Sequence, residues 1–207
     1  MKNVYWLIDG SYLYKSMIQF RKIISNFNID YKKLKDKLEK EFCVESEKLI
    51  SYYFNSTPNP ATDAQNAFHS WLKCAPPVGP NIRVELYSLK KGFVKCKKCN
   101  EMITNYVQKG VDVGIVTAAL KYCNKYDKLI VSAGDGDFKD TFKYLSEELD
   151  KEIIILSFKH GLSTDLQQYS SRVLFMDDFY NEISDSRGKT PPPFDQADEI
   201  IVEDIGK

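Results

Sequence analysis

Apolar residues follow two patterns along the chain. In some segments they form short, nearly continuous runs, and in others they recur every three or four positions. The first pattern is typical of buried strands, and the second is typical of helices that pack along one side. Strands are predicted at residues 4–8, 49–54, 82–89, 129–132, 152–157 and 172–176. Helices are predicted at residues 13–24, 31–42, 61–74, 111–126 and 138–149, with a short helix beginning at residue 163.

Strands and helices therefore alternate for most of the chain. This order predicts an α/β fold with a mostly parallel central sheet and helices on both faces. Two segments depart from it. Residues 92–107 are predicted to form a β-hairpin, which makes residues 90–107 an insertion. After residue 181 large apolar residues become scarce and Pro191-Pro192-Pro193 follows. We predict one domain over residues 1–181 and a flexible acidic tail over residues 182–207, with a linker at 184–196.

Charge is informative only in its distribution. Lysine plus arginine and aspartate plus glutamate both total 29, so the net charge of zero indicates no class of partner. Residues 83–98 carry six basic side chains and one acid, whereas residues 184–207 carry six acids and three bases. A local basic strip can bind a polyanion even at zero net charge. The 207 residues, 43% of them hydrophobic, suffice for one domain with a substantial core.

Location is predicted from apolar runs and cysteines. No apolar run approaches the length of a membrane span, and the chain enters a strand-like segment at once, without a signal-peptide pattern. There are five cysteines, an odd number that favours a reducing compartment over a disulfide framework. We therefore expect a cytoplasmic protein with no membrane partner.

Carboxylates follow the apolar strands at two places. Asp9 closes the first predicted strand, and Asp135 and Asp137 close the central strand within Gly134-Asp135-Gly136-Asp137. A third element, the helix predicted at 111–126, carries Asp112 in its first turn. Ligands of open α/β sheets bind outside the carboxyl ends of the strands, so these side chains are candidates for one shared site.

Each of these acids also has a purely structural interpretation. An Asp after a strand can cap the next helix or hydrogen-bond a turn, and an Asp in a first turn is favoured by the helix dipole. Taken singly, each is better explained that way. Taken together they favour a metal site, because hard cations such as Mg²⁺ or Mn²⁺ prefer several carboxylate oxygens and retained waters. Such ions activate water and neutralise charge on a phosphodiester.

Three motifs carry a resemblance to a known family. They are Ile8-Asp9-Gly10-Ser11, Lys109-Gly110-Val111-Asp112-Val113 and Ser132-Ala133-Gly134-Asp135-Gly136-Asp137-Phe138. Their order and their positions at strand and helix ends resemble the signatures of the NYN domain family, in the LabA-like branch of the PIN-like nucleases, over residues 3–179. The resemblance implies a Rossmann-like PIN fold and metal-dependent cleavage of RNA. It assigns catalysis and the Mg²⁺ or Mn²⁺ ligands to Asp9, Asp112, Asp135 and Asp137.

Four further residues near these motifs are candidates for substrate binding. The hydroxyls of Ser11 and Ser132 could orient water, and Lys109 could meet a phosphate oxygen, although a solvated surface lysine is an equal alternative. Tyr12 stands where the family usually has Asn. It could stack on a base, or it could mark weakened catalysis. Neither histidine, His69 or His160, lies in a motif, so a general base is not expected from them.

The predicted hairpin holds a C-x-x-C pair at its tip. Cys96 and Cys99 have zinc-knuckle spacing, but a structural Zn²⁺ needs four ligands. Cys74, Cys123 or the second pair of a homodimer could complete the set. Around them lie Lys95, Lys97 and Lys98, with the aromatic residues Phe93 and Tyr106 nearby. This basic hairpin could hold single-stranded RNA, or its lysines could simply be solvated.

The tail and the function each leave alternatives open. Residues 199–205 could add a strand to the sheet of a protein partner or cover a basic groove, and a disordered terminus is the simpler interpretation. The first functional hypothesis is a metal-dependent ribonuclease, with RNA as its substrate. The second is an RNA-binding module with a weakened site. The third, a small-molecule phosphatase or nucleotide binder, is disfavoured because no G-x-G-x-x-G or P-loop motif is present.

Overall fold

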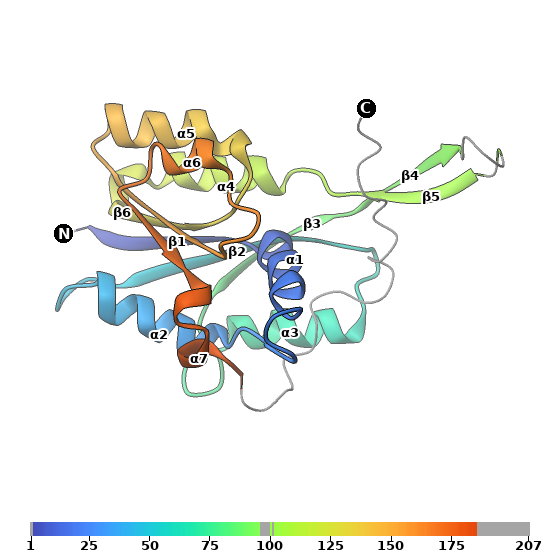
Figure 1. Cartoon of the computed structure of the whole chain (residues 1–207), viewed down its shortest axis with the longest axis horizontal. Coiled ribbons are helices and arrows are strands. Elements are labelled where there is room, and N and C mark those ends of the chain that lie inside the picture. Colours follow the sequence, from blue (N-terminus) through green and yellow to red (C-terminus); the bar gives the residue numbers. More distant parts are fainter. Residues whose placement is uncertain (1, 96–99, 101, 186–207) are drawn as a thin grey trace.

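The central feature of the computed structural model, which describes residues 2–95, 100 and 102–185, is a six-stranded sheet (Figure 1). Its strand order is β3-β2-β1-β6-β7-β8, and every neighbouring pair is parallel. The strands are β1 (Asn3–Asp9), β2 (Leu49–Thr57), β3 (Arg83–Ser88), β6 (Tyr126–Ser132), β7 (Glu152–Ser157) and β8 (Arg172–Phe175). The predicted α/β fold with a parallel sheet is confirmed.

Helices cover both faces of this sheet. One face carries α1 (Gly10–Phe20), α2 (Tyr31–Phe42), α3 (Asp63–Lys73) and α7 (Tyr180–Ile183). The other carries α4 (Val111–Lys121), α5 (Lys139–Lys143) and α6 (Thr164–Gln167). Shorter turns are η1 (Cys123–Lys125), η2 (Gly136–Phe138), η4 (Met176–Asp178) and the π-helical η3 (Tyr144–Glu148).

The two cores follow from the alternation of side chains along each strand. Trp6 and Ile8 of β1 point into the core beneath α1, α2 and α3, whereas Tyr5 and Leu7 point into the core beneath α4 and α5. Successive strand residues face opposite sides of a sheet, so a strand that is covered on both faces must be apolar throughout. The continuous apolar runs of the sequence therefore result from a sheet that is covered by helices on both faces.

Three predicted helix boundaries shift in the structure. The helix expected at 13–24 begins at Gly10, because Asp9 caps it immediately after the strand. The helix expected at 111–126 ends at Lys121, since Tyr126 already begins β6. The helix expected at 138–149 is divided into η2, α5 and the π-helical turn η3.

The strand order reverses direction between β1 and β6. From β1 the chain builds outward through β2 to β3, crosses back to β6, and then builds outward through β7 to β8. Such a reversal opens a crevice outside the carboxyl ends of the two central strands, where ligands of open α/β sheets bind. Asp9 ends β1 and Asp135 follows β6, so both predicted acids stand at this reversal.

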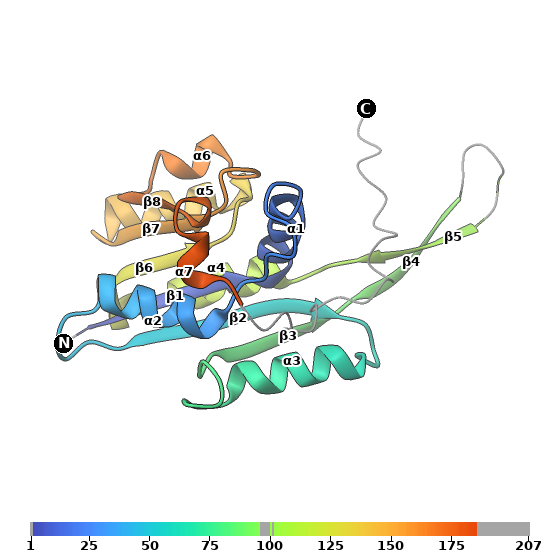
Figure 2. The ribbon, with the colours of Figure 1, turned by 60° about the horizontal axis from the view of Figure 1, so that its bottom comes forward.

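The insertion forms two antiparallel strands that project away from the sheet (Figure 2). They are β4 (Lys90–Lys95) and β5 (Met102–Val107). The predicted pairing of this segment is thus present. Cys96, Lys97, Lys98 and Cys99, at the predicted tip, lie outside the described residues.

The packed domain extends beyond its predicted end at residue 181. Ile183 is fully buried, and Ser184 forms an antiparallel bridge with Ile29. The Asp185 N–H donates to the Asn28 carbonyl at 2.9 Å. The boundary prediction was therefore short by at least four residues, because a buried isoleucine in a polar stretch is a weak sequence signal.

Candidate active site

Asp9 is the most buried of the four predicted carboxylates. It is the last residue of β1 and the N-cap of α1, and its side chain is 7% exposed. The carboxylate Oδ1 accepts hydrogen bonds from the Tyr12 N–H and from the Ser11 hydroxyl, each at 3.0 Å. Ser11 therefore lies in the site as predicted, and both groups fix the orientation of the Asp9 carboxylate.

Asp135 and Asp137 lie beside Asp9 on the turn that follows β6. Ile8 pairs in register with Ser132, which brings the ends of β1 and β6 together. Asp135 is the N-cap of η2, and its Oδ1 accepts from the Asp137 N–H at 3.0 Å. Both side chains are exposed. This turn thus presents two carboxylates to solvent at the edge where Asp9 is buried.

Asp112 arrives at the same edge from α4. It lies in the first turn of that helix and is exposed. The preceding Gly110 has a φ of 92°, a left-handed conformation that side-chain-bearing residues rarely adopt, and it packs against the ring of Tyr87. The glycine of the Lys109-Gly110 motif thus allows the sharp entry that starts α4 directly above the sheet edge.

The charges of the four carboxylates are coupled. Burial raises the pKa of Asp9, and the nearby charge of Asp112 raises it further, while the hydrogen bonds from Tyr12 and Ser11 oppose the shift. Burial also raises the pKa of Asp112, with added repulsion from Asp135 and Asp137. Carboxylates affect one another in this way only when they are close in space. Asp112 is therefore near enough to Asp9, Asp135 and Asp137 for their charges to interact, and the binding of a metal ion by these four acids stays a prediction.

The donor set fits a hard cation. No group of three or more acidic, histidine or cysteine side chains within the described residues is close enough to form a ready-made cage. Mg²⁺ does not require one, because it is usually held by one or two carboxylates together with waters and substrate phosphates. Among the ion pairs of the described residues, none involves these four acids, so their mutual repulsion is not relieved by a neighbouring lysine or arginine in that way.

Ser132 is a correction to the predicted site. Its hydroxyl accepts a hydrogen bond from the Trp6 indole at 2.9 Å, and the residue is fully buried. Ser132 shares the sheet face of Ile130 and Trp6, beneath α1 and α2, whereas Asp9 lies on the opposite face with Leu7. The structure therefore places Ser132 in the core and away from water or substrate.

Tyr12 occupies a position between three strand ends. Its ring lies against Gly134, where an added Cβ would come within 2.2 Å of it, and its hydroxyl is 2.6 Å from Ser157 Oγ at the end of β7. The Ser157 hydroxyl donates to the Phe158 carbonyl, so Tyr12 is the donor in their shared bond. Half-buried in this way, the ring offers little free face for the base stacking considered from the sequence.

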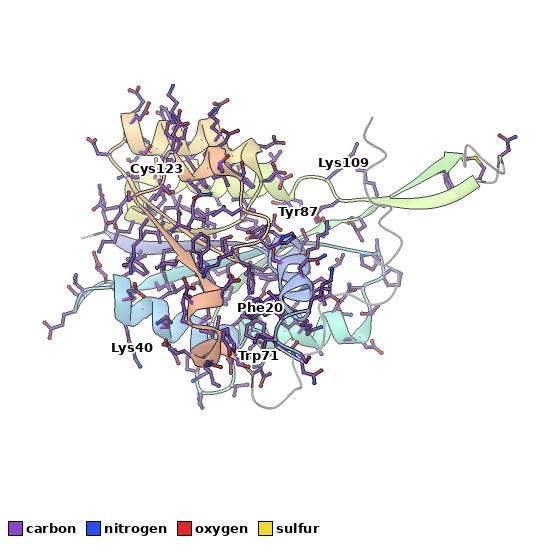
Figure 3. All side chains as sticks on the ribbon, viewed as in Figure 1. Phe20, Lys40, Trp71, Tyr87, Lys109 and Cys123 are labelled. Atoms are coloured by element: carbon purple, nitrogen blue, oxygen red, sulfur yellow. The ribbon has the colours of Figure 1, made fainter. Side chains whose placement is uncertain are left out.

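Lys109 and the hairpin lie next to the acidic edge. Lys109 is exposed, and Figure 3 shows it near Tyr87 at the base of the hairpin. Lys95 ends β4, and Phe93 on the same strand is 63% exposed. The predicted contribution of Lys95, Lys97 and Lys98 to RNA binding stays a prediction, since the last two residues lie outside the described part of the chain.

The positions of Cys74 and Cys123 disfavour them as the missing ligands of a zinc site at Cys96 and Cys99, which lie outside the described residues. Cys74 caps the end of α3 before β3 begins, and Cys123 lies between α4 and β6. Both positions are at the amino ends of the strands, whereas the hairpin continues from the carboxyl end of β3. Figure 3 shows Cys123 on the side of the molecule away from the hairpin. Zinc at Cys96 and Cys99 would need ligands from elsewhere.

Sequence reasoning missed an aromatic groove beside the acidic edge. It has a volume of about 360 Å³ and lies between α4 and the strands β2 and β3. Six of its lining residues are Tyr52, Phe54, Glu85, Tyr87, Lys121 and Tyr122. The aromatic residues come from three elements, so no local motif could have revealed them. Of the two histidines, His69 is buried and His160 is exposed.

Fold and site together define a Rossmann-like α/β domain with clustered carboxylates at the reversal of strand order. A profile of the NYN domain matches residues 3–177. The chain therefore belongs to the NYN domain family, a PIN-like nuclease family, as the three motifs predicted. Its expected place in the LabA-like branch stays a prediction.

Comparison with solved structures supports the fold. A protein of unknown function from Vibrio parahaemolyticus superposes with a TM-score of 0.62 at 17% identity, over 88% of this chain and 96% of that one. An isochorismatase-like hydrolase from Alkaliphilus metalliredigens reaches a TM-score of only 0.29 at 10% identity, over 87% and 97% of the two chains, which is too low to support an argument. A search of curated proteins found no match.

Within the described residues, no helix combines the length and apolar character that crossing a membrane requires.

Proposed function

We propose that the chain is a metal-dependent ribonuclease that hydrolyses single-stranded RNA, with Mg²⁺ or Mn²⁺ held by Asp9, Asp112 and Asp135 and by Asp137 beside them. One observation supports this proposal most strongly. Burial raises the pKa values of Asp9 and Asp112 at the reversal of strand order, and repulsion from nearby carboxylates of other elements adds to both shifts. A divalent cation relieves that repulsion, so the edge favours its binding.

The buried and the exposed side chains of the site have different roles. A bound cation of this type lowers the pKa of a water ligand and neutralises charge on a phosphate. Asp9 is held in one orientation by the Tyr12 N–H and the Ser11 hydroxyl, so it supplies a fixed carboxylate. Asp112, Asp135 and Asp137 are exposed and can adjust to the substrate. Lys109 is exposed next to Gly110 and can bind a phosphate oxygen as a point charge.

The test is cleavage of labelled single-stranded RNA after removal and return of Mn²⁺. We expect Asp9→Asn and Asp135→Asn each to reduce the cleavage rate about 100-fold or more, the scale on which one lost electrostatic group slows an enzyme. Asparagine keeps the capping ability of both positions, so the fold should survive. Asp30→Asn is the matched control, because Asp30 is also a buried N-cap, at the start of α2, and should retain wild-type activity.

The second candidate function is an RNA-binding module with weakened catalysis. Tyr12 favours it, because the ring fills the space between Gly134 and Ser157 where the family usually has a smaller amide. The same assay separates the two functions. Metal-independent cleavage that persists in Asp9→Asn contradicts the metal-dependent nuclease. Absence of cleavage by the wild type, with salt-sensitive RNA binding retained, supports the binding module.

A further inference from the structure

Aromatic rings pack in a row along the groove beside the acidic edge. The rings of Tyr52 and Tyr122 lie 5.5 Å apart between centroids with an interplanar angle of 23°, and Phe54 continues the row from Tyr52 at 6.2 Å and 23°. These rings come from β2 and from the residue after α4, on the face of the sheet that α4 covers (Figure 1). Tyr52 and Phe54 are buried and form the floor of the groove, whereas Tyr122 and Tyr87 are half-buried and leave part of each ring accessible for stacking.

Cations surround the row of rings. The guanidinium of Arg83 lies 5.1 Å from the Tyr52 centroid and donates to the Tyr52 hydroxyl at 2.5 Å. The ammonium groups of Lys121 and Lys125 lie 5.3 and 5.4 Å from the Tyr122 centroid. Glu85 is the acid in the lining. Three cations against one acid give this groove a positive rim, which complements a ligand that carries both rings and phosphates.

Helix α4 connects the groove to the acidic edge. Gly110 and Gly114 both face the groove, where the ring of Tyr87 lies against them; a Cβ at Gly114 would come within 2.0 Å of the Tyr87 hydroxyl. Asp112 lies between these glycines in the first turn of α4. The axial distance from Asp112 to Lys121 is about 14 Å at the rise of an α-helix. A strand that crosses the acidic edge therefore reaches Tyr122 within a few nucleotides.

We propose that this groove binds unpaired bases of the RNA strand whose phosphodiester lies at the acidic edge. The inference rests on the proposed function for its choice of substrate, and it adds a second, separate contact region for that substrate. Bases stack on the accessible parts of Tyr122 and Tyr87, and phosphates pair with Lys121 and Arg83. Stacking of this kind is tolerant of sequence, because every base has a π-face. The groove thus determines how long a segment of RNA is bound, without selecting its base sequence.

The first experiment measures RNA binding by fluorescence anisotropy. The probe is a labelled, unstructured RNA of about 12 nucleotides, within the usual range of single-strand sites. We expect Tyr122→Ala to raise the Kd about tenfold and Tyr122→Phe to leave it close to wild type, because phenylalanine preserves stacking. Tyr144→Ala is the matched control, since Tyr144 is 48% exposed on η3 and does not line the groove.

The second experiment isolates the charge contribution. We expect Lys121→Gln to reduce the slope of log Kd against log salt concentration by about one, the value for one lost phosphate contact. Lys143→Gln, on the exposed side of α5, should leave the slope unchanged. Photocrosslinking of RNA that contains 4-thiouridine to the wild-type protein provides a readout independent of any variant, with crosslinks expected in the peptide that contains Lys121 and Tyr122.

Several outcomes overturn the inference. Unchanged Kd for Tyr122→Ala, equal loss in Tyr144→Ala, or crosslinks confined to the hairpin would show that bases do not occupy the groove. Its failure is distinct from that of the proposed function. Metal-dependent cleavage with normal binding by the groove variants removes the groove alone. Crosslinks at Tyr122 without cleavage by the wild type remove the nuclease and keep the groove as an RNA-binding site.

Discussion

The ends of β1 and β6 use the same local device with different results. Asp9 ends β1 and Asp135 follows the end of β6; each caps the next helical turn, and each carboxylate accepts a backbone N–H through Oδ1 at 3.0 Å. Asp9 is nevertheless buried, and burial together with the charge of Asp112 raises its pKa. Asp135 is exposed. Capping alone explains an aspartate such as Asp135, but it does not explain a carboxylate buried beside another.

This difference separates what capping requires of an aspartate from what capping does not explain. A cap needs an oxygen near the first N–H groups of a helix, and asparagine or serine supplies it as well. Burial of a second charge near the first opposes folding unless something compensates. The burial of Asp9 near Asp112 therefore has an unfavourable free energy that capping does not explain, and the proposed bound cation would compensate for it. The following predictions test that distinction, in order of decreasing effect.

The largest effect is expected at Gly134, in the turn after β6. An added Cβ there would lie 2.2 Å from the Tyr12 ring and 2.4 Å from the Gly161 carbonyl oxygen. Gly134→Ala should therefore reduce the free energy of unfolding by about 3 kcal/mol or more, because the added methyl group forces the backbone to move. Urea denaturation measures it. Gly136→Ala, whose Cβ would meet only Ser163 Oγ at 3.1 Å, should cost far less; equal losses would contradict the close packing described here.

Addition of Mn²⁺ should stabilise the wild-type protein. Metal that binds only the folded state adds about 2.7 kcal/mol at a concentration 100 times its Kd. We expect the melting temperature to rise with Mn²⁺ in the wild type and in Asp30→Asn, and to rise much less in Asp9→Asn. Differential scanning fluorimetry measures this without any RNA. An undiminished shift in Asp9→Asn would mean that the cation binds elsewhere.

Tyr12→Phe tests the link between the β1 and β7 ends. The change removes one hydrogen bond, from the Tyr12 hydroxyl to Ser157 Oγ, and keeps the ring against Gly134. Loss of such a bond should lower the free energy of unfolding by about 1 kcal/mol. Thermal unfolding measures the change, and Tyr144→Phe serves as an exposed control with no expected effect. A neutral result would show that the ring alone holds these strand ends together.

The smallest effect concerns pH. Because the pKa of folded Asp9 is raised, the folded state binds its proton more tightly than the unfolded state does. Stability from this group is therefore greatest at low pH and falls as the pH rises through the raised pKa. Without metal, Asp9→Asn should melt slightly higher than the wild type at neutral pH, and the difference should vanish as the medium becomes acidic. A variant that melts lower at neutral pH would contradict this sign.

The sequence predicted what depends on neighbours along the chain. Strand and helix identities follow from local residue types. The shared edge at which β1 and β6 end also followed, because parallel strands share one carboxyl edge, and the metal site at that edge stays a prediction. Ser132 was misplaced although the signal was available. Counting by twos from Ile130 puts its side chain on the core face with Trp6, opposite to Asp9.

Features assembled from distant segments could not be predicted. The groove combines Tyr52, Tyr87 and Tyr122 from three elements, and each appears in the sequence as an ordinary aromatic residue of a strand or helix. Docking of Ser184 and Asp185 against residues 28 and 29 depends on backbone hydrogen bonds, which carry no residue signature. In both cases the information lies in the tertiary arrangement.

Tyr12 joins α1, which begins at the end of β1, to the end of β7, and β6 lies between those two strands. The turn that carries Asp135 and Asp137 therefore lies beneath the link between Tyr12 and Ser157, and its Gly134 packs against the Tyr12 ring. The spacing between the buried Asp9 and the exposed Asp135 and Asp137 is therefore set by the packing of the protein, before any ligand binds.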